Sequence, residues 1–245
     1  MIPKILHYVW LGNQDKPESV LKCIETWNKY LPDYQIIEWN EKNFDVENYA
    51  YCKEAYENKK YAFVSDVIRL EALKKMGGIY LDTDVEILSD FQNLLENKSF
   101  LGFESIDKIG TAIIGAEKNT SWVGEILDKY MNKKFINNKG EFDTTTNVEM
   151  ITEYLFSNWG LELNGESQNL KNQINIYSND YFYPKNIYTK VINVTDNTVA
   201  IHHFEGTWIS KNNKRNKKLY SSFVNILGEN RARTLKEIIK KIMNR

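Results

Sequence analysis

One stretch decides the fold: residues 62–84 read AFVSDVIRLEALKKMGGIYLDTD. The apolar residues from 62 to 76 recur with the spacing of an α-helix. Gly77 and Gly78 predict the end of that helix, because glycine tolerates the backbone conformations that follow a helix C-terminus. Residues 79–81 then predict a short buried strand. The stretch is therefore a helix that leads directly into a strand.

Two carboxylates follow this strand, Asp82 and Asp84. Because side chains alternate along a strand, residues two apart point to the same side. Two hard oxygen ligands on one side suit Mg²⁺ or Mn²⁺ better than zinc. A bare Asp-x-Asp more often belongs to a turn or a solvated loop, but the apolar strand before it and Val85 after it favour a metal site.

A second charged pair lies on the helix of this stretch. On a helical wheel of about 100° per residue, Asp66 and Arg69 fall opposite the polar stripe. That stripe contains Glu71, Lys74 and Lys75. An acid and a base turned away from the polar stripe form either a buried structural ion pair or a polar clamp for a ligand. The direct connection of this helix to the Asp82 strand favours the clamp.

The flanking sequence predicts an α/β fold. Residues 5–11 and 34–39 read as strands, and residues 19–30 between them read as a helix, which is a βαβ opening. Further helices are expected at 48–58, 61–76, 120–132 and 145–157. Further strands are expected at 85–88, 99–104, 111–116, 174–177 and 199–204. The Asn-rich residues 160–175 are expected to form mostly loop.

The composition is that of an ordinary globular protein. The 245 residues are 42% hydrophobic and 27% charged, which excludes a disordered or fibrous chain. No apolar run is long enough to span a membrane, and we do not expect the short apolar start to be a signal peptide. The two cysteines, Cys23 and Cys52, have no metal-finger spacing. We therefore expect a cytoplasmic protein.

The net charge of −1 hides an asymmetry. Residues 211–245 contain eleven Lys or Arg and two Asp or Glu, a net charge of +9, so residues 1–210 carry −10. We expect a catalytic domain at 1–210 and a basic tail at 211–245, whose last residues form an amphipathic helix. Because no nucleic-acid signature accompanies the basic residues, an anionic membrane surface is the favoured partner. The alternative is a solvated helical face.

The chain resembles the DXD-type sugar transferases of glycosyltransferase family 32, the capsular polysaccharide and mannosyltransferase-like group. The glucosylating clostridial toxins are more distant relatives. The matching stretches are residues 2–12 (IPKILHYVWLG), Asp66 with Arg69, 77–84 (GGIYLDTD), 181–184 (YFYP) and 200–208 (AIHHFEGTW). The resemblance implies a GT-A fold, a mixed sheet flanked by helices. It also implies a UDP-sugar donor, Mn²⁺ or Mg²⁺, and retention of anomeric configuration.

The resemblance further implies roles for individual residues. The nucleotide-sugar would contact Trp10, Asp66, Arg69, Tyr80, Asp82 and Trp208. The metal would be held by Asp82, Asp84 and either His202 or His203. Because adjacent strand residues face opposite ways, only one of the two histidines can reach the metal. We favour His202 from its spacing to Trp208. The groups closest to the reaction would be Asp66, Arg69 and Asp84.

The implied activity is transfer of a hexose or N-acetylhexosamine to an oligosaccharide or lipid-linked glycan acceptor. The expected pathway is synthesis of a surface polysaccharide, capsule or O-antigen, with the enzyme bound peripherally on the inner face of the plasma membrane. A front-face route and a double displacement both remain open. The alternatives to a transferase are a nucleotide-sugar hydrolase and a non-catalytic binding module for nucleotide sugars or glycans.

Overall fold

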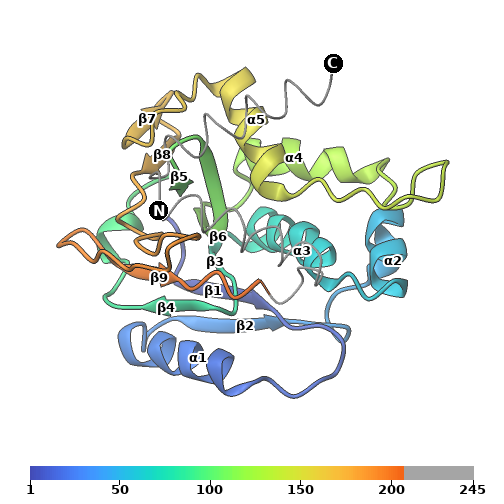
Figure 1. Cartoon of the computed structure of the whole chain (residues 1–245), viewed down its shortest axis with the longest axis horizontal. Helices are drawn as coiled ribbons and strands as arrows, with labels where there is room; N and C mark the ends of the chain where they lie inside the picture. The colour runs from blue at the N-terminus through green and yellow to red at the C-terminus, as the bar shows by residue number, and fades with distance from the viewer. Residues whose placement is uncertain (207–245) are drawn as a thin grey trace. The chain divides into compact units, whose positions relative to one another are not determined.

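The computed structural model describes residues 1–206, and its main feature is a mixed seven-stranded sheet flanked by helices (Figure 1). The chain begins with β1 (Ile5–Val9), α1 (Glu18–Tyr30) and β2 (Gln35–Trp39). The strands β1 and β2 pair in parallel, with Ile5 opposite Gln35. The predicted βαβ opening is therefore confirmed.

The helix of the deciding stretch lies in the core. After α2 (Ala50–Glu57) comes α3 (Tyr61–Met76), which leads into β3 (Gly78–Leu81). Helix α3 contacts β1 and β3 as well as α2 and α4. With neighbours on several sides, it buries apolar residues around most of its circumference, including Val64, Val67 and Leu70.

The turn between α3 and β3 requires its two glycines. Gly77 has φ of 70° and Gly78 has φ of 108°, in the region that side chains with a Cβ rarely adopt. A Cβ on Gly78 would also lie 2.4 Å from the carbonyl oxygen of Ile5 on the neighbouring strand. This tight turn carries the chain from the helix directly into the strand that ends at Asp82.

The remaining elements complete the sheet. They are β4 (Val85–Ile87), β5 (Ser99–Ser105), β6 (Lys108–Ala116), α4 (Ser121–Met131), α5 (Asn147–Trp159), β7 (Gln168–Leu170), β8 (Ile174–Tyr177) and β9 (Ala200–His202), with short 3-10 helices at Val46–Asn48 and Gln92–Leu94. The strand order is β2-β1-β3-β6-β5-β8-β7. Strand β6 runs antiparallel to both β3 and β5, while β5 and β8 are parallel. The expectation of a mixed α/β sheet is confirmed. The loop predicted for residues 160–175 contains β7, a strand of three residues that is too short to show a strand period in the sequence.

A separate two-stranded sheet lies beside the end of β3. Strand β4 pairs with β9 in antiparallel register, with Val85 opposite His202. Helix α1 packs against β4, and the indole nitrogen of Trp27 donates a hydrogen bond of 2.7 Å to the Val85 carbonyl. This small sheet brings residues near position 200 to the segment that follows Asp82.

The described residues belong to two compact units. The sheet and the site described below lie in the first unit, Met1–Pro184 with Val194–His203. In the second unit, Lys185–Asn193 forms a closed loop in which Asn186 Oδ1 accepts hydrogen bonds from two backbone amides, Tyr188 and Thr189. The predicted basic tail at 211–245 lies outside the described residues.

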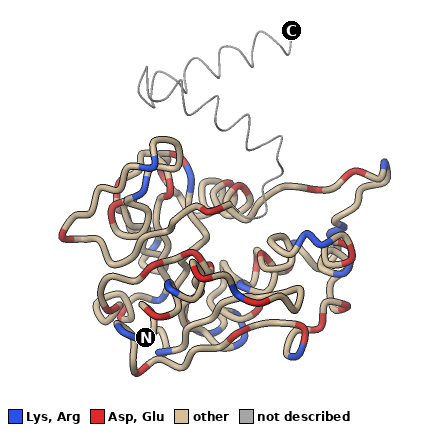
Figure 2. Tube along the Cα trace, turned by 60° about the horizontal axis from the view of Figure 1, so that its bottom comes forward, with Lys and Arg blue, Asp and Glu red and all other residues tan. Residues whose placement is uncertain are grey.

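Charged residues are spread widely over the described part of the chain. Figure 2 shows Lys and Arg interspersed with Asp and Glu along the trace. Within residues 1–206, no helix has the length and apolar character that crossing a membrane requires.

Candidate functional site

The DXD segment forms a turn rather than the continuation of a strand. Strand β3 ends at Leu81, and the Asp82 amide still donates to the Ala112 carbonyl of β6 at 2.8 Å. The chain then turns, and the Val85 amide donates to the Asp82 carbonyl at 3.2 Å as β4 begins. Both carboxylates lie near each other because of this turn, and not because of the strand alternation that the sequence suggested.

The small sheet adds a histidine to the two carboxylates. Ligand atoms of Asp82, Asp84 and His202 all lie within 4.8 Å of one another. The Nε2 atom of His202 is 3.2 Å from Asp84 Oδ1. The neighbouring His203 turns away, and its Nε2 lies 2.8 Å from Glu86 Oε2. Of the two histidines, the structure therefore groups His202 with the DXD carboxylates.

This donor set fits a divalent cation. Two carboxylates and one imidazole are hard to borderline ligands, a combination suited to Mn²⁺ and compatible with Mg²⁺. Burial lowers the pKa of His202, but the hydrogen bond and charge of Asp84 and the charges of Asp82 and Glu104 raise it by more. The pKa of His202 therefore lies above its ordinary value. Negative charge thus dominates at this point, which favours a bound cation.

The buried pair on α3 connects to the same carboxylates. Asp66 and Arg69 are only 8% and 4% exposed. An Arg69 guanidinium nitrogen lies 3.1 Å from Asp66 Oδ1 and 3.3 Å from Asp82 Oδ1. The guanidinium also donates to the Thr111 carbonyl at 2.7 Å. Arg69 is therefore held in one place between the helix and the DXD turn.

Charge and burial compete at this pair. Burial raises the pKa of Asp66 to about 6, and the nearby Arg69 charge only partly offsets it. Burial lowers the pKa of Arg69, but the charges of Asp82, Tyr80 and Asp66 raise it above its ordinary value. The arginine thus stays charged. An acidic group whose pKa is raised by burial is a common feature of functional sites.

Tyr80 joins the pair to the DXD turn. Its hydroxyl donates a 2.8 Å hydrogen bond to Asp82 Oδ1, and the Arg69 guanidinium carbon lies 4.5 Å from the centre of its ring. The Asp82 oxygen that faces Arg69 is therefore also fixed by Tyr80. Two tryptophans, Trp10 and Trp208, were also predicted to bind the nucleotide. Trp10 donates its indole N–H to the Gln14 carbonyl at 2.7 Å, and Trp208 lies outside the described residues.

Asn147, which begins α5, is a further residue of the site that was not predicted from the sequence. Its amide donates to Asp66 Oδ2 at 3.4 Å, and its side-chain nitrogen donates to the Asp66 carbonyl at 2.7 Å. Thr146 caps the helix in a capping box with Glu149. This Thr-x-x-Glu pattern could have located the helix start from the sequence, but not its contact with Asp66. Thr111, which receives the Arg69 hydrogen bond, carries no sequence pattern of its own.

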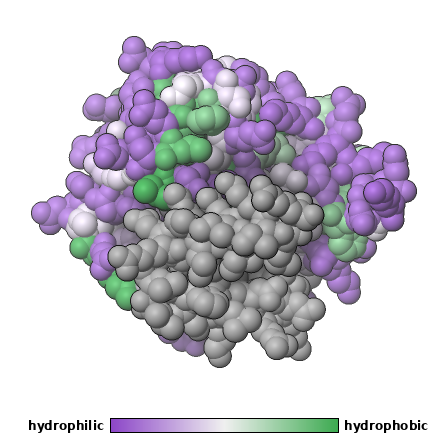
Figure 3. Space-filling model, turned by 45° about the horizontal axis from the view of Figure 1, so that its top comes forward, coloured by the Kyte–Doolittle hydropathy of each residue, from purple (hydrophilic) through white to green (hydrophobic). Residues whose placement is uncertain are grey.

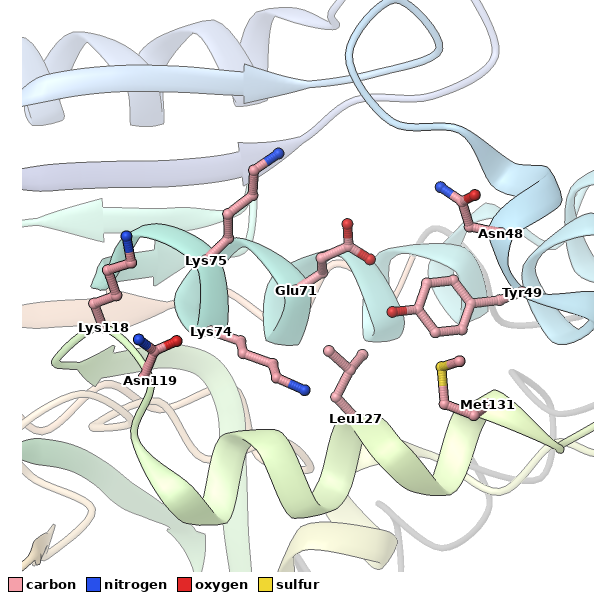
Figure 4. Close-up of a pocket in the computed structure, with 9 residues that line it drawn as sticks. All are labelled: Asn48, Tyr49, Glu71, Lys74, Lys75, Lys118, Asn119, Leu127 and Met131. Atoms are coloured by element: carbon pink, nitrogen blue, oxygen red, sulfur yellow. The ribbon is translucent and has the colours of Figure 1, made fainter.

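A hollow of about 600 Å³ lies on the side of α3 that carries the polar stripe (Figure 4). It is lined by Asn48, Tyr49, Glu71, Lys74, Lys75, Lys118, Asn119, Leu127 and Met131. Its α3 residues are the polar stripe that the helical wheel placed opposite Asp66 and Arg69. This hollow is therefore distinct from the carboxylate cluster.

The comparisons with known proteins agree with this geometry. Residues 17–101 match the family described as "Glycosyltransferase sugar-binding region containing DXD motif". This segment includes α3, the Asp66 and Arg69 pair, and the DXD turn. The match covers two of the stretches that carried the resemblance, Asp66 with Arg69 and residues 77–84, and confirms the predicted similarity to DXD-type glycosyltransferases.

Named relatives are similar over parts of the chain. Inositol phosphoceramide mannosyltransferase 3 of Schizosaccharomyces pombe is 28% identical over 130 residues, which are 51% of this chain and 36% of that protein. The uncharacterized glycosyltransferase L373 of Acanthamoeba polyphaga mimivirus is 25% identical over 207 residues, 77% of this chain and 75% of that protein. The chain thus spans about a third of the length of the first relative.

A solved structure supports the fold. The PaToxG glycosyltransferase superposes with a TM-score of 0.50 at 20% identity, over 64% of this chain and 69% of that one. The predicted GT-A type of fold is therefore confirmed.

Proposed function

We propose that the chain is a metal-dependent, retaining glycosyltransferase that moves a hexose or N-acetylhexosamine from a UDP-sugar to a glycan acceptor. The observation that carries the proposal is the grouping of Asp82, Asp84 and His202 beside the fixed guanidinium of Arg69. A surface-polysaccharide pathway, either capsule or O-antigen, is part of the proposal and rests on the resemblance.

The residues of the site suit departure of a nucleoside diphosphate. When bound at Asp82, Asp84 and His202, a divalent cation would supply positive charge to the diphosphate. Arg69 adds a second positive charge, and its contacts with Thr111 and Asp82 hold it in place before the reaction. Charge that is oriented in advance stabilises a developing anion without reorganisation.

Asp66 and its partners suit the sugar side of the donor. The Asp66 carboxylate accepts a hydrogen bond from the Asn147 amide at the start of α5 and forms an ion pair with Arg69. A carboxylate with such fixed partners can accept hydrogen bonds from sugar hydroxyls in a defined orientation. We assign it to donor recognition. Trp10 and Trp208 remain our proposed contacts for the nucleotide.

A donor panel tests the proposal directly. Release of nucleoside diphosphate is measured from UDP- and GDP-linked sugars, with Mn²⁺, Mg²⁺ or EDTA, and with or without a mixture of oligosaccharide acceptors. Release that requires metal and rises with acceptor supports a transferase. Metal-dependent release that ignores acceptors indicates a nucleotide-sugar hydrolase, and binding without release indicates a binding module.

We also propose that the enzyme works at an anionic membrane surface, where a lipid-linked glycan acceptor would be found. The support is the net charge of +9 in residues 211–245. Basic residues near an anionic surface contribute about 1 kcal/mol each to binding.

A further inference from the structure

A groove runs along α5. It has a volume of about 510 Å³. It is lined by Lys108, Thr145, Glu149, Thr152, Glu153, Phe156 and Leu163. One wall is α5, and Lys108 at the start of β6 belongs to the other.

Both walls of the groove lead to the candidate site. Thr145 lies two residues before Asn147, whose amide reaches Asp66 at 3.4 Å. On the other wall, Lys108 lies three residues before Thr111 on β6, whose carbonyl accepts the Arg69 hydrogen bond of 2.7 Å. Both walls therefore continue into the partners of Asp66 and Arg69, the residues to which we assign the donor.

The groove combines an aromatic ring with carboxylates. Phe156 is 56% exposed and Leu163 is 40% exposed, in a face that Glu149 and Glu153 share. Exposed apolar side chains grouped in a groove mark binding surfaces more often than isolated ones do. Figure 3 shows hydrophobic side chains exposed among hydrophilic ones on the face turned to the viewer.

The spacing along α5 gives the groove length and direction. Glu149 and Phe156 lie two turns apart on one helix face, about 10 Å along the axis. Glu149 is already used in the capping box with Thr146. Within residues 1–206 the Glu153 side chain is exposed and has no hydrogen bond or ion pair, so its carboxylate is available to a ligand.

The charge of the groove indicates what kind of ligand fits. Its two carboxylates outnumber its single lysine, so an anionic ligand would be repelled. A sugar ring offers an apolar face for an aromatic side chain and hydroxyls for carboxylates. We propose that this groove binds the neutral sugar residues of the acceptor glycan, with Phe156 against a ring face and Glu153 accepting hydroxyl hydrogen bonds. This proposal rests on the proposed transferase function.

The test uses the full chain and two readouts. Wild type, Phe156→Ala, Glu153→Gln and the control Met131→Ala are compared on an array of neutral oligosaccharides that includes phosphorylated and sialylated members. Met131 is also 56% exposed but lies in the hollow on the far side of α3, so it controls for loss of an exposed apolar side chain. The second readout is metal-dependent release of nucleoside diphosphate without acceptor.

We expect wild type and Met131→Ala to bind the same neutral glycans. Phe156→Ala and Glu153→Gln should bind them about tenfold more weakly. All four proteins should release nucleoside diphosphate equally in the absence of acceptor. If glycan affinity depends on Phe156 but wild type shows no donor turnover, the groove is a glycan-binding site and the proposed transferase function is wrong.

Other outcomes reject the groove itself. Equal glycan binding by wild type and Phe156→Ala, a preference for phosphorylated glycans, or no binding to any glycan on the array would each overturn the assignment. So would sugar transfer to polypeptides that is undiminished in Phe156→Ala. These outcomes leave the donor readout intact, so they are separable from failure of the proposed function.

Discussion

Asp84 allows the metal site to be tested with a small structural change. Its carboxylate contacts His202, whereas the Asp82 carboxylate also forms an ion pair with the buried Arg69. Asp84→Asn should lower metal-dependent turnover by about two to three orders of magnitude, because a metal ligand is lost. The melting temperature should change little.

The measurement is turnover against Mn²⁺ concentration, beside a thermal melt. Asp33→Asn is the control, because it removes an exposed carboxylate that pairs with Lys4, away from the DXD turn. Full activity of wild type in EDTA, or wild-type behaviour of Asp84→Asn at every Mn²⁺ concentration, would contradict the metal assignment.

Arg69 distinguishes a structural ion pair from a donor clamp. Arg69→Ala would leave the buried Asp66 carboxylate and the partly exposed Asp82 carboxylate without their cation. The free energy of unfolding should then fall by about 3–5 kcal/mol, as measured by urea denaturation. Arg69→Lys keeps the charge but cannot span the same partners, so it should lose less stability and still use donor poorly. If Arg69→Ala melted like wild type, the pair would be a clamp with no structural part.

His7 should make the stability of the fold depend on pH. It is fully buried in β1, its Nε2 lies 2.8 Å from the Gly77 carbonyl oxygen, and its Nδ1 accepts a hydrogen bond from the Trp39 indole. Since Trp39 can only donate, Nδ1 is unprotonated and Nε2 carries the hydrogen. Protonation of Nδ1 would break this arrangement.

The direction of the effect follows from the pKa. Burial lowers the pKa of His7 below its ordinary 6.5, despite the hydrogen bond to Gly77 that raises it. The unfolded chain therefore takes up the proton first, and the free energy of unfolding falls as the pH drops below about 6.5. His7→Gln should cost about 1–3 kcal/mol near pH 8 and lose less on acidification. Urea denaturation of both proteins between about pH 8 and pH 5 measures the free energy of unfolding. If it falls equally with pH in wild type and His7→Gln, His7 is not the cause of the pH dependence.

At the scale of single residues, the sequence predicted what local periodicity controls. The helical wheel placed Asp66 and Arg69 away from the lysine stripe, and both are buried. It could not identify Asn147 or Thr111 as their partners. Those contacts join positions more than forty residues apart in the chain, and only the packing of α5 and β6 against α3 creates them.

At the scale of elements, the capping box of α5 should affect both stability and donor use. Thr146 accepts a hydrogen bond from the Glu149 amide, and the Glu149 carboxylate accepts one from Thr146. Thr146→Ala should lower the free energy of unfolding by about 0.5–2 kcal/mol. It should also raise the KM for donor, because the cap positions Asn147 against Asp66.

Thr146→Ser is the matched control, because serine keeps the capping hydroxyl. It should stay close to wild type in both thermal melts and donor KM. A Thr146→Ala protein with reduced stability and unchanged donor KM would show that the start of α5 does not shape the donor site.

Element boundaries followed from the sequence better than their arrangement did. The expected helix at 61–76 and strand at 174–177 match α3 and β8. Their apolar periods are local and strong. The insertion of β6 between β3 and β5, and the pairing of β4 with β9, are contacts between distant segments with no local sequence signature. The histidine of the site depends on that last pairing.

At the scale of the whole molecule, charge separates the chain into two parts. Residues 1–210 carry a net charge of −10 and residues 211–245 carry +9. An acidic body is repelled by an anionic bilayer, so the basic residues must supply the attraction if the enzyme docks there. Five of them fall within residues 211–218: Lys211, Lys214, Arg215, Lys217 and Lys218.

Changing these five residues to glutamine should abolish docking while leaving catalysis in solution intact. At about 1 kcal/mol for each basic residue, the loss of affinity would exceed a thousandfold. Co-sedimentation with vesicles containing anionic lipid, at low and high salt, measures it. The control changes five exposed lysines of the acidic body to glutamine: Lys42, Lys59, Lys98, Lys134 and Lys139. Wild type and control should sediment with anionic vesicles at low salt and release at high salt. Equal sedimentation of the tail variant and wild type would show instead that the basic residues form a solvated face.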